Sequence, residues 1–202
     1  MKTAIRISCV LFFLLLLGGC ATSITSEVTR YHKDVLPSGE TIAIVPLNDA
    51  KKGSLEFAAH AQLVAKKLTE IGYKVVNADA NPQLLAKMDY TVGPAETKIQ
   101  TWPRNFVHYH FYYGHAYPYF YGTYWDEPDI YSYTVYMRTL ILNIVKTDGE
   151  SIFEGHVDSV GQEHSLNKVM PYLVDAMFNN FPGESGVTKV VTIQQDNTNH
   201  PY

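Results

Sequence analysis

The chain has 202 residues, of which 46% are hydrophobic, so it is long enough to bury one core of ordinary size. Its 16 basic and 20 acidic side chains give a formal net charge of −4, which argues against a nucleic-acid-binding protein, because neutralising phosphates needs a concentrated excess of Lys and Arg. Both cysteines lie within the first twenty residues, which excludes a disulfide framework or a Cys-based zinc site in the folded part.

The first nineteen residues have the pattern of a bacterial lipoprotein signal peptide. A basic start at Lys2 and Arg6 precedes an apolar run, and residues 17–20 read LGGC, which is a lipobox. The thiol of Cys20 is the nucleophile that accepts diacylglycerol, and further acyl chains such as palmitate make the anchor durable. An uncleaved membrane anchor is the alternative, but the apolar run is shorter than the ~20 residues that a span needs. We therefore predict a signal peptide at 1–19, lipidation of Cys20 and a tether at 20–27.

The lipid predicts a domain held at a membrane surface rather than inserted in it. Ala21 follows Cys20 at the position where an inner-membrane retention signal usually has Asp. Resemblance to proteobacterial lipoproteins therefore implies sorting to the cell outer membrane, with the domain facing the periplasm.

The first half of the mature chain predicts short strands around one long helix. Ser54 is a suitable cap for a helix over 55–71, whose apolar residues recur every three or four positions, and Gly72 ends it. Asn81 and Pro82 suit the start of a short helix near 83–87. The expected strands of this half span 28–31, 41–47, 73–76 and 89–100, the last one bent at Gly93 and Pro94.

The second half predicts a hairpin followed by a helix. Strands over 131–146 and 150–160 are joined through Asp148 and Gly149, a common tight-turn pair. The helix lies within 166–181, with a kink or a late start at Pro171, because proline removes an interior hydrogen bond. Residues 187–202 form a partly disordered tail, and the sequence leaves open whether 187–193 adds an edge strand.

This order of elements predicts a single α+β domain over 28–186. We expect a mostly antiparallel sheet with two main helices packed on one face, interrupted by an insertion at 102–129.

Several runs carry a family resemblance. They read TIAIVPL, LVAKKLTEIGYKVV and YTVYMRTLILNIVKTDGESIFEGHVDSV, followed by a helix that ends in NNFP. With the lipobox, these runs resemble the bacterial lipoproteins of domain-of-unknown-function family 4136 over most of residues 25–182. The resemblance implies a surface-tethered α+β domain, often with an aromatic and Gly-rich insertion, and it brings no established catalytic residues. In this chain the insertion is rich in His and Tyr instead.

More than half of the aromatic side chains are concentrated in the insertion and the residues that follow it. Fifteen of them lie between Trp102 and Tyr136. Tyrosine gives a large contact area with a polar tip at little entropic cost, so the insertion suits a docking surface for an envelope protein or a glycan. The equal alternative is a flap packed on its own sheet. The candidate binding residues are Tyr109, Tyr112, Tyr113, Tyr117, Tyr119, Tyr121, Tyr124 and Trp125.

Three histidines in the insertion are candidate metal ligands. His108 and His110 fall on the same side of an extended chain, and His115 can return across a turn. Three neutral imidazoles suit zinc, copper or nickel, whereas the alternative is ordinary hydrogen-bonded surface groups. We expect no cofactor, with a divalent metal at these histidines as the competing hypothesis.

Catalytic patterns are weak. His156 and Asp158 alternate on one expected strand, and Glu154 with Asp158 forms a conceivable carboxylate pair, but no Gly-x-Ser-x-Gly motif accompanies them. The chain also lacks the Gly-rich phosphate loop, the dinucleotide fingerprint and the zinc-protease motif. We therefore expect a non-catalytic binding or structural component of the envelope. A metal-binding lipoprotein is the alternative, followed by an envelope hydrolase.

Overall fold

The computed structural model describes residues 23–33, 36, 39–102, 108–112, 115–119 and 129–194, and of 102, 108–112, 115–119 and 129 it describes the backbone. The strands are β1 (Ser23–His32), β2 (Thr41–Pro46), β3 (Lys74–Val75), β4 (Leu84–Trp102), β5 (His108–Tyr112), β6 (His115–Tyr119), β7 (Asp129–Lys146), β8 (Ser151–Gly161) and β9 (Val187–Gln194). The helices are α2 (Leu55–Glu70) and α3 (Leu166–Phe178), with short 3-10 turns η1 (Asp49–Lys51) and η2 (Ala78–Ala80).

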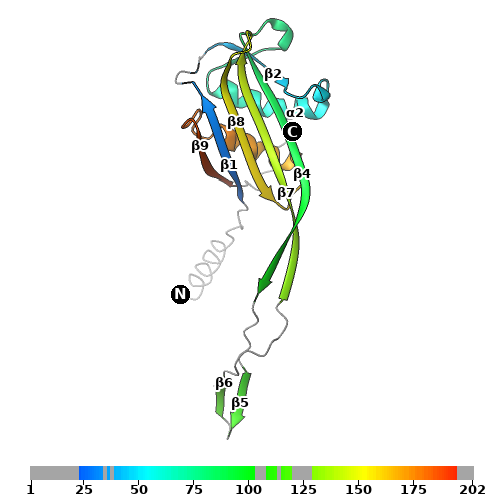
Figure 1. Ribbon diagram of the computed structural model, residues 1–202, viewed down its shortest axis with the longest axis vertical. Helices are drawn as coiled ribbons and strands as arrows, with labels where there is room; N and C mark the ends of the chain where they lie inside the picture. Colours follow the sequence, from blue (N-terminus) through cyan, green and yellow to red (C-terminus); the bar gives the residue numbers. More distant parts are fainter. Residues whose placement is uncertain are drawn as a thin grey trace, which may run out of the picture.

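Seven strands form one sheet in the order β3-β2-β4-β7-β8-β1-β9 (Figure 1). The predicted α+β class stands, but the prediction of a mostly antiparallel sheet was wrong, because the sheet is mixed. β2 runs parallel to both β3 and β4, whereas β4, β7, β8, β1 and β9 pair antiparallel in succession. The reason is that α2 serves as the crossover from β2 to β3, and such a connection returns the chain in the same direction.

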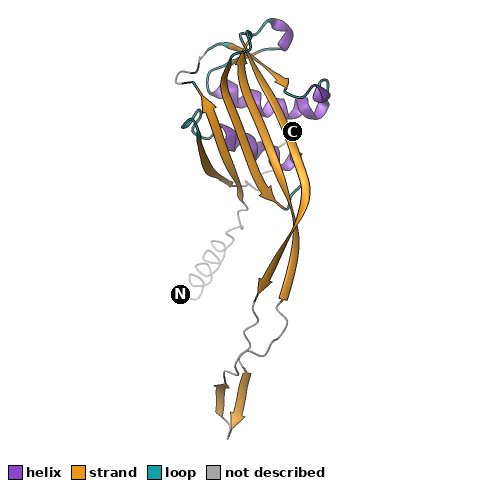
Figure 2. Ribbon diagram, in the orientation of Figure 1, coloured by secondary structure: helices purple, strands orange, loops and turns teal. Residues whose placement is uncertain are grey.

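Both helices lie on one face of the sheet, as the sequence predicted (Figure 2). The Ser54 hydroxyl caps α2 by accepting a hydrogen bond from the backbone N–H of Phe57 at 3.3 Å. Gly72, with φ of 102°, takes the left-handed conformation that ends the helix. The buried stripe of α2 consists of Phe57, His60, Val64 and Leu68.

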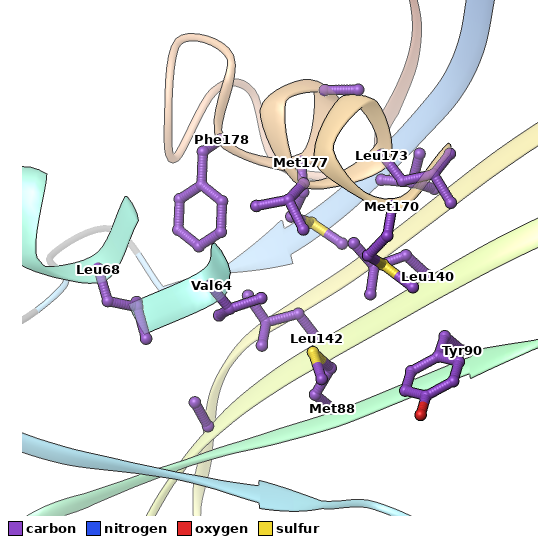
Figure 3. Close-up of a cluster of buried hydrophobic side chains, with 14 of the residues drawn as sticks. Val64, Leu68, Met88, Tyr90, Leu140, Leu142, Met170, Leu173, Met177 and Phe178 are labelled. Atoms are coloured by element: carbon purple, nitrogen blue, oxygen red, sulfur yellow. The ribbon is translucent and has the colours of Figure 1, made fainter. Parts of the chain in front are cut away.

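The second helix, α3, supplies the densest part of the core. It begins at Leu166, five residues before Pro171, so of the two expectations at this proline, a kink or a late start, the late start was wrong. Met170, Leu173 and Met177 are fully buried against Leu140 and Leu142 of β7 (Figure 3). Close packing on β8 requires Gly155, because a Cβ there would overlap the sulfur of Met177.

The sheet includes two segments whose structure was predicted wrongly or left open, residues 84–87 and 187–194. The short helix expected near Gln83–Lys87 was wrong, because these residues lead into β4, whose Leu84 pairs with Ile42 of β2 and with Lys146 of β7. The open question about the tail is also resolved, because Val187–Gln194 forms the edge strand β9 on β1. β1 itself begins at Ser23, so residues 23–27 of the expected tether lie in the sheet.

The core predicts a strong contrast between two leucine substitutions. Leu142 is fully buried, whereas Leu55 is 88% exposed at the start of α2. We expect Leu142→Ala to lower the free energy of unfolding by roughly 2–5 kcal/mol, because it removes buried methyl groups and leaves a cavity. The matched variant Leu55→Ala changes it by no more than about 0.5 kcal/mol. Urea denaturation followed by circular dichroism measures both, and equal losses would contradict this assignment of the core.

Candidate binding surface

β4 and β7 continue beyond the rest of the sheet as a two-stranded arm, which we call the ribbon (residues 95–102 and 129–136; Figure 1). Its first pair joins Ala95 to Tyr136 and its last joins Trp102 to Asp129. A shift in the register between Val92 and Ala95 marks where it leaves the sheet. The bend predicted at Gly93 and Pro94 falls at this shift, and such irregularities commonly redirect a strand.

The ribbon exposes apolar side chains on both strands. Ile99 and Ile130 are 70% and 67% exposed, and Tyr131 and Tyr133 are 59% and 39% exposed. Among the described residues, neither helix covers this part of β4 and β7 (Figure 2). The register places Ile99 and Ile130 on one face of the ribbon and Tyr131 and Tyr133 on the other. Exposed apolar groups concentrated in one arm are typical of interaction surfaces. The sequence analysis counted Tyr131 and Tyr133 among the crowded aromatics but named none of these four residues as a candidate binding residue, because the sequence did not show that the two strands stay paired so far from the core.

The root of the ribbon is fixed to the core by a buried arginine. Arg138, 3% exposed, donates hydrogen bonds to the backbone oxygen of Glu163 at 3.1 Å and to the hydroxyl of Ser159 at 2.9 Å. Burial lowers the pKa of this guanidinium, and the charge of Glu163 opposes the shift. Tyr136 packs its ring against His164, with centroids 5.5 Å apart. The ribbon therefore extends from a well-anchored base.

The predicted insertion residues fall partly in a second hairpin, β5–β6. The backbone pairs His108 with Tyr119, Tyr109 with Pro118, His110 with Tyr117 and Tyr112 with His115. Directly paired residues share a face of a hairpin, and faces alternate along each strand. The register therefore assigns His108, His110 and His115 to positions on one face, together with Tyr112, Tyr117 and Tyr119, whereas Tyr109 takes a position on the other.

The remaining predicted site residues lie outside the described residues. These are Cys20, Tyr113, Tyr121, Tyr124 and Trp125. In the described part of the chain, no helix has the length and apolarity needed to cross a membrane. Within the same residues, no group of three or more His, Cys, Asp or Glu side chains is arranged to hold a metal ion.

A polar row crosses the sheet face that the helices leave open. As predicted, His156 and Asp158 lie on the same side, with Nε2 of the histidine 2.8 Å from a carboxylate oxygen. The hydroxyl of Thr139 donates to the other oxygen of Asp158 at 2.5 Å. In a hydrolytic triad the hydroxyl donates to the histidine instead. The row therefore contains a hydroxyl, an imidazole and a carboxylate, but it lacks the hydrogen bond from hydroxyl to imidazole that a triad needs.

Sequence reasoning missed a second cluster, at the start of α2. His60 and Tyr90 are buried and in edge-to-face contact, with ring centroids 4.9 Å apart. The Lys51 ammonium lies 3.6 Å from the centre of the Tyr90 ring and 2.5 Å from the Asp89 carboxylate. Among the residues that the structure describes, Nε2 of His60 and the Tyr90 hydroxyl have no partner within hydrogen-bond distance, since the Glu56 carboxylate oxygen lies 3.7 Å from Nε2. The signal was present in the sequence, since His60 lies three residues after Phe57 and four before Val64 on the apolar stripe of α2.

Burial lowers the pKa of His60, because the charged imidazolium loses its hydration. The Glu56 carboxylate, 3.7 Å from Nε2, opposes the shift, and the positive charge of Lys51 adds to it. The Tyr90 pKa is raised, first by burial and then by the charges of Glu56 and Asp89.

A pH-dependent loss of stability follows from this histidine. Below the unfolded-state pKa of about 6.5, the unfolded chain takes up a proton that folded His60 resists, so stability falls as the pH falls toward the lowered folded value. We expect the melting temperature to drop less on acidification in His60→Phe, which keeps an aromatic ring against Tyr90. The variant His164→Phe, at an exposed position, controls for the other histidines. Identical pH profiles for wild type and His60→Phe would contradict the prediction.

A separate groove of about 310 Å³ lies between the ends of α2 and α3 and the edge strand β9. Lys67 of α2 spans it to Asp175 of α3 at 2.8 Å and also approaches Glu70 at 3.6 Å. The charged groups that line the groove thus pair with one another, and the ion pair between Lys67 and Asp175 links α2 to α3.

A family model described as a domain of unknown function (DUF4136) matches residues 27–183. No curated protein matches the sequence. Among solved structures, a PDZ domain protein from Parabacteroides distasonis is 13% identical, with a TM-score of 0.48 over 85% of this chain and 39% of that one. The chain thus spans about two fifths of that protein. Two PelC dodecamer structures from Paraburkholderia phytofirmans, 9% and 10% identical, match 75% of this chain and 92% and 93% of theirs, with TM-scores of 0.38 and 0.36.

Proposed function

The chain belongs to the DUF4136 family, and we propose that it is a lipid-anchored, non-catalytic binding component of the cell envelope, held at the outer membrane through Cys20. The ribbon and the hairpin beyond it form its contact surface for another component of the envelope. An envelope protein or a glycan is the partner that the tyrosines of the insertion favour.

The observation that carries this proposal is the ribbon. An isolated two-stranded ribbon is marginally stable in water at best, yet this one extends from the sheet with exposed Ile99, Ile130 and Tyr131. Burying these exposed apolar side chains against a partner is favourable, because it removes them from water. Catalysis, in contrast, needs convergent groups in a concave site, and the polar row around Asp158 lies on an open sheet face.

The lipobox supports the anchoring part of the proposal. Residues 17–20 read LGGC, and the folded domain starts three residues after Cys20, at Ser23. Such a short connection holds the domain close to the membrane surface, because three residues span at most about 11 Å.

We expect Cys20→Ser to remove the protein from the outer-membrane fraction, because the lipid acceptor is lost. In parallel, a photoreactive amino acid at Tyr133 of the ribbon should capture an envelope component in intact cells, whereas the same group at Glu154 on the open sheet face should not. Fractionation and mass spectrometry of the captured material measure the two outcomes. Unchanged fractionation of Cys20→Ser would refute the anchor, and equal capture at both positions would refute the ribbon as the contact surface.

A metal-binding envelope lipoprotein is the second candidate function, and the register of β5–β6 favours it. His108 and His110 take alternate positions on β5, and His115 takes a position on the same face of the hairpin. Imidazole ligands on one face suit zinc, copper or nickel.

We expect protein purified without a histidine tag to carry a divalent metal if this second function holds, and the triple variant His108→Ala, His110→Ala, His115→Ala to lose it. Elemental analysis and metal-induced shifts in melting temperature report on binding, with His156→Ala as a matched control outside the hairpin. Absence of bound metal and of any shift would exclude this candidate and leave the docking proposal untouched.

A further inference from the structure

The first strand and the ribbon share one end of the sheet. β1 begins at Ser23, and its Glu27 pairs with Asp158 of β8. Three residues further along β8, Gly161 pairs with Tyr136, the residue at which the ribbon starts. Antiparallel pairing therefore brings the beginning of β1 level with the root of the ribbon, as Figure 1 also shows. Neighbouring strands are about 4.8 Å apart, so the two points are close.

The lengths of the two segments restrict how the domain can sit on a membrane. Cys20 precedes Ser23 by three residues, so a lipid on Cys20 holds the beginning of β1 within about 11 Å of the lipid surface. The ribbon runs from Ala95 to Trp102, which is about 23 Å of extended chain. An arm pointed straight at the membrane would therefore reach well past the lipid surface.

The backbone of the ribbon excludes such a vertical placement. Apart from Tyr136, which also pairs with Gly161 of β8, the residues of each strand have a single partner among the described residues, so the outer edge of each strand carries unpaired N–H and C=O groups. Unpaired backbone groups are not tolerated in the hydrocarbon core, where water is absent. The ribbon must then lie along the interface, where these groups stay hydrated.

The two faces of the ribbon differ in charge. Direct pairs place Ile99 with Ser132, Thr101 with Ile130 and Thr97 with Thr134 on one face, which has no charged residue. The other face carries all the charged residues of the ribbon. They are Glu96, Lys98 and Asp129.

The isoleucines on the uncharged face are the most exposed large hydrophobic side chains of the ribbon, at 70% for Ile99 and 67% for Ile130. On the opposite face, Lys98 forms an ion pair with Glu96 at 3.1 Å, which suits contact with water. The charged face also carries the exposed Tyr131 and Tyr133, so the two faces differ in charge rather than in apolar content. The uncharged face is therefore the one that can meet a lipid surface without taking a charge out of water.

We infer that the uncharged face of the ribbon, centred on Ile99 and Ile130, rests on the surface of the lipid bilayer that holds the Cys20 anchor. This inference rests on the proposed function, since it needs the lipid on Cys20, and it names the first surface that the ribbon meets. The ribbon then directs the aromatic hairpin sideways along the membrane, toward neighbouring envelope components.

Site-directed fluorescence on the lipidated full chain tests this arrangement. Cys9 lies in the predicted signal peptide and Cys20 carries the lipid, so a single introduced cysteine is the only free thiol of the mature protein. Ile99→Cys and Ile130→Cys report on the uncharged face. Lys98→Cys and Gln100→Cys, on the charged face of the same strand pair, are the matched controls. Each variant is labelled with an environment-sensitive fluorophore and reconstituted into vesicles of phosphatidylethanolamine and phosphatidylglycerol, with and without nitroxide-labelled lipid.

We expect a blue-shifted emission and quenching by the nitroxide lipid at positions 99 and 130, and neither effect at 98 and 100. Equal quenching on both faces, or none at 99 and 130 in protein that floats with the vesicles, would overturn the inference while leaving the lipid anchor intact. Failure of the wild-type protein to float would instead refute the anchor itself. Unquenched labels at 99 and 130, combined with photo-crosslinking of these positions to a protein in cells, would assign this face to a protein partner.

Discussion

The long antiparallel pairing of β4 with β7 is the constraint on which the rest of the structure depends. β4 joins the two halves of the sheet, because it runs parallel to β2 along 84–88 and antiparallel to β7 along its whole length. β2 ends at Pro46, while β8 first pairs with β7 at Tyr136. Beyond these points, in the part of the chain that the structure describes, β4 and β7 pair only with each other. The core and the exposed ribbon are thus two parts of one pair of strands, and a slip in its register would displace both.

Periodic sequence patterns predicted the elements that bury one clear face. The spacing of apolar residues in 55–71 and the alternation in 131–146 gave α2 and β7 with bounds close to those observed. The short helix expected near 83–87 failed because Asn81 and Pro82 are a local capping signal, whereas Leu84, Ala86 and Met88 are fixed by burial between β2 and β7. Alternation within a strand does not show its direction, but the expected order of a strand at 41–47, a helix at 55–71 and a strand at 73–76 is a strand–helix–strand unit, which favours a parallel pair. The expectation of a mostly antiparallel sheet overlooked this signal.

The sequence shows which residue types gather at the candidate site, but it does not show which of them share a face of the ribbon. The crowding of Tyr and His before residue 129 is visible in the sequence, and it led to the hypothesis of a docking surface, with a flap packed on its own sheet as the equal alternative. That Ile99 and Ile130 share one uncharged face depends on a register set by the shift between Val92 and Ala95. A single residue of slip would exchange the faces. For the edge strand β9 the difficulty was different, because most of its side chains are exposed and give no amphipathic signal.

Two buried arginines connect α3 and the segment before it to the sheet, and one of them, Arg138, lies at the base of the ribbon. Arg30 of β1 donates to the backbone oxygen of Ala176 at 2.8 Å, near the end of α3, where a positive charge is favoured by the helix dipole. Arg138 of β7 instead holds the segment that leads into α3, through the backbone oxygen of Glu163. Arg138 lies two residues after Tyr136, where the ribbon begins. The same guanidinium therefore contacts both the base of the ribbon and the segment that leads into α3. A rigid base and an uncovered arm together favour recognition by the projecting surface, since the free energy that orders the root is already provided by the core.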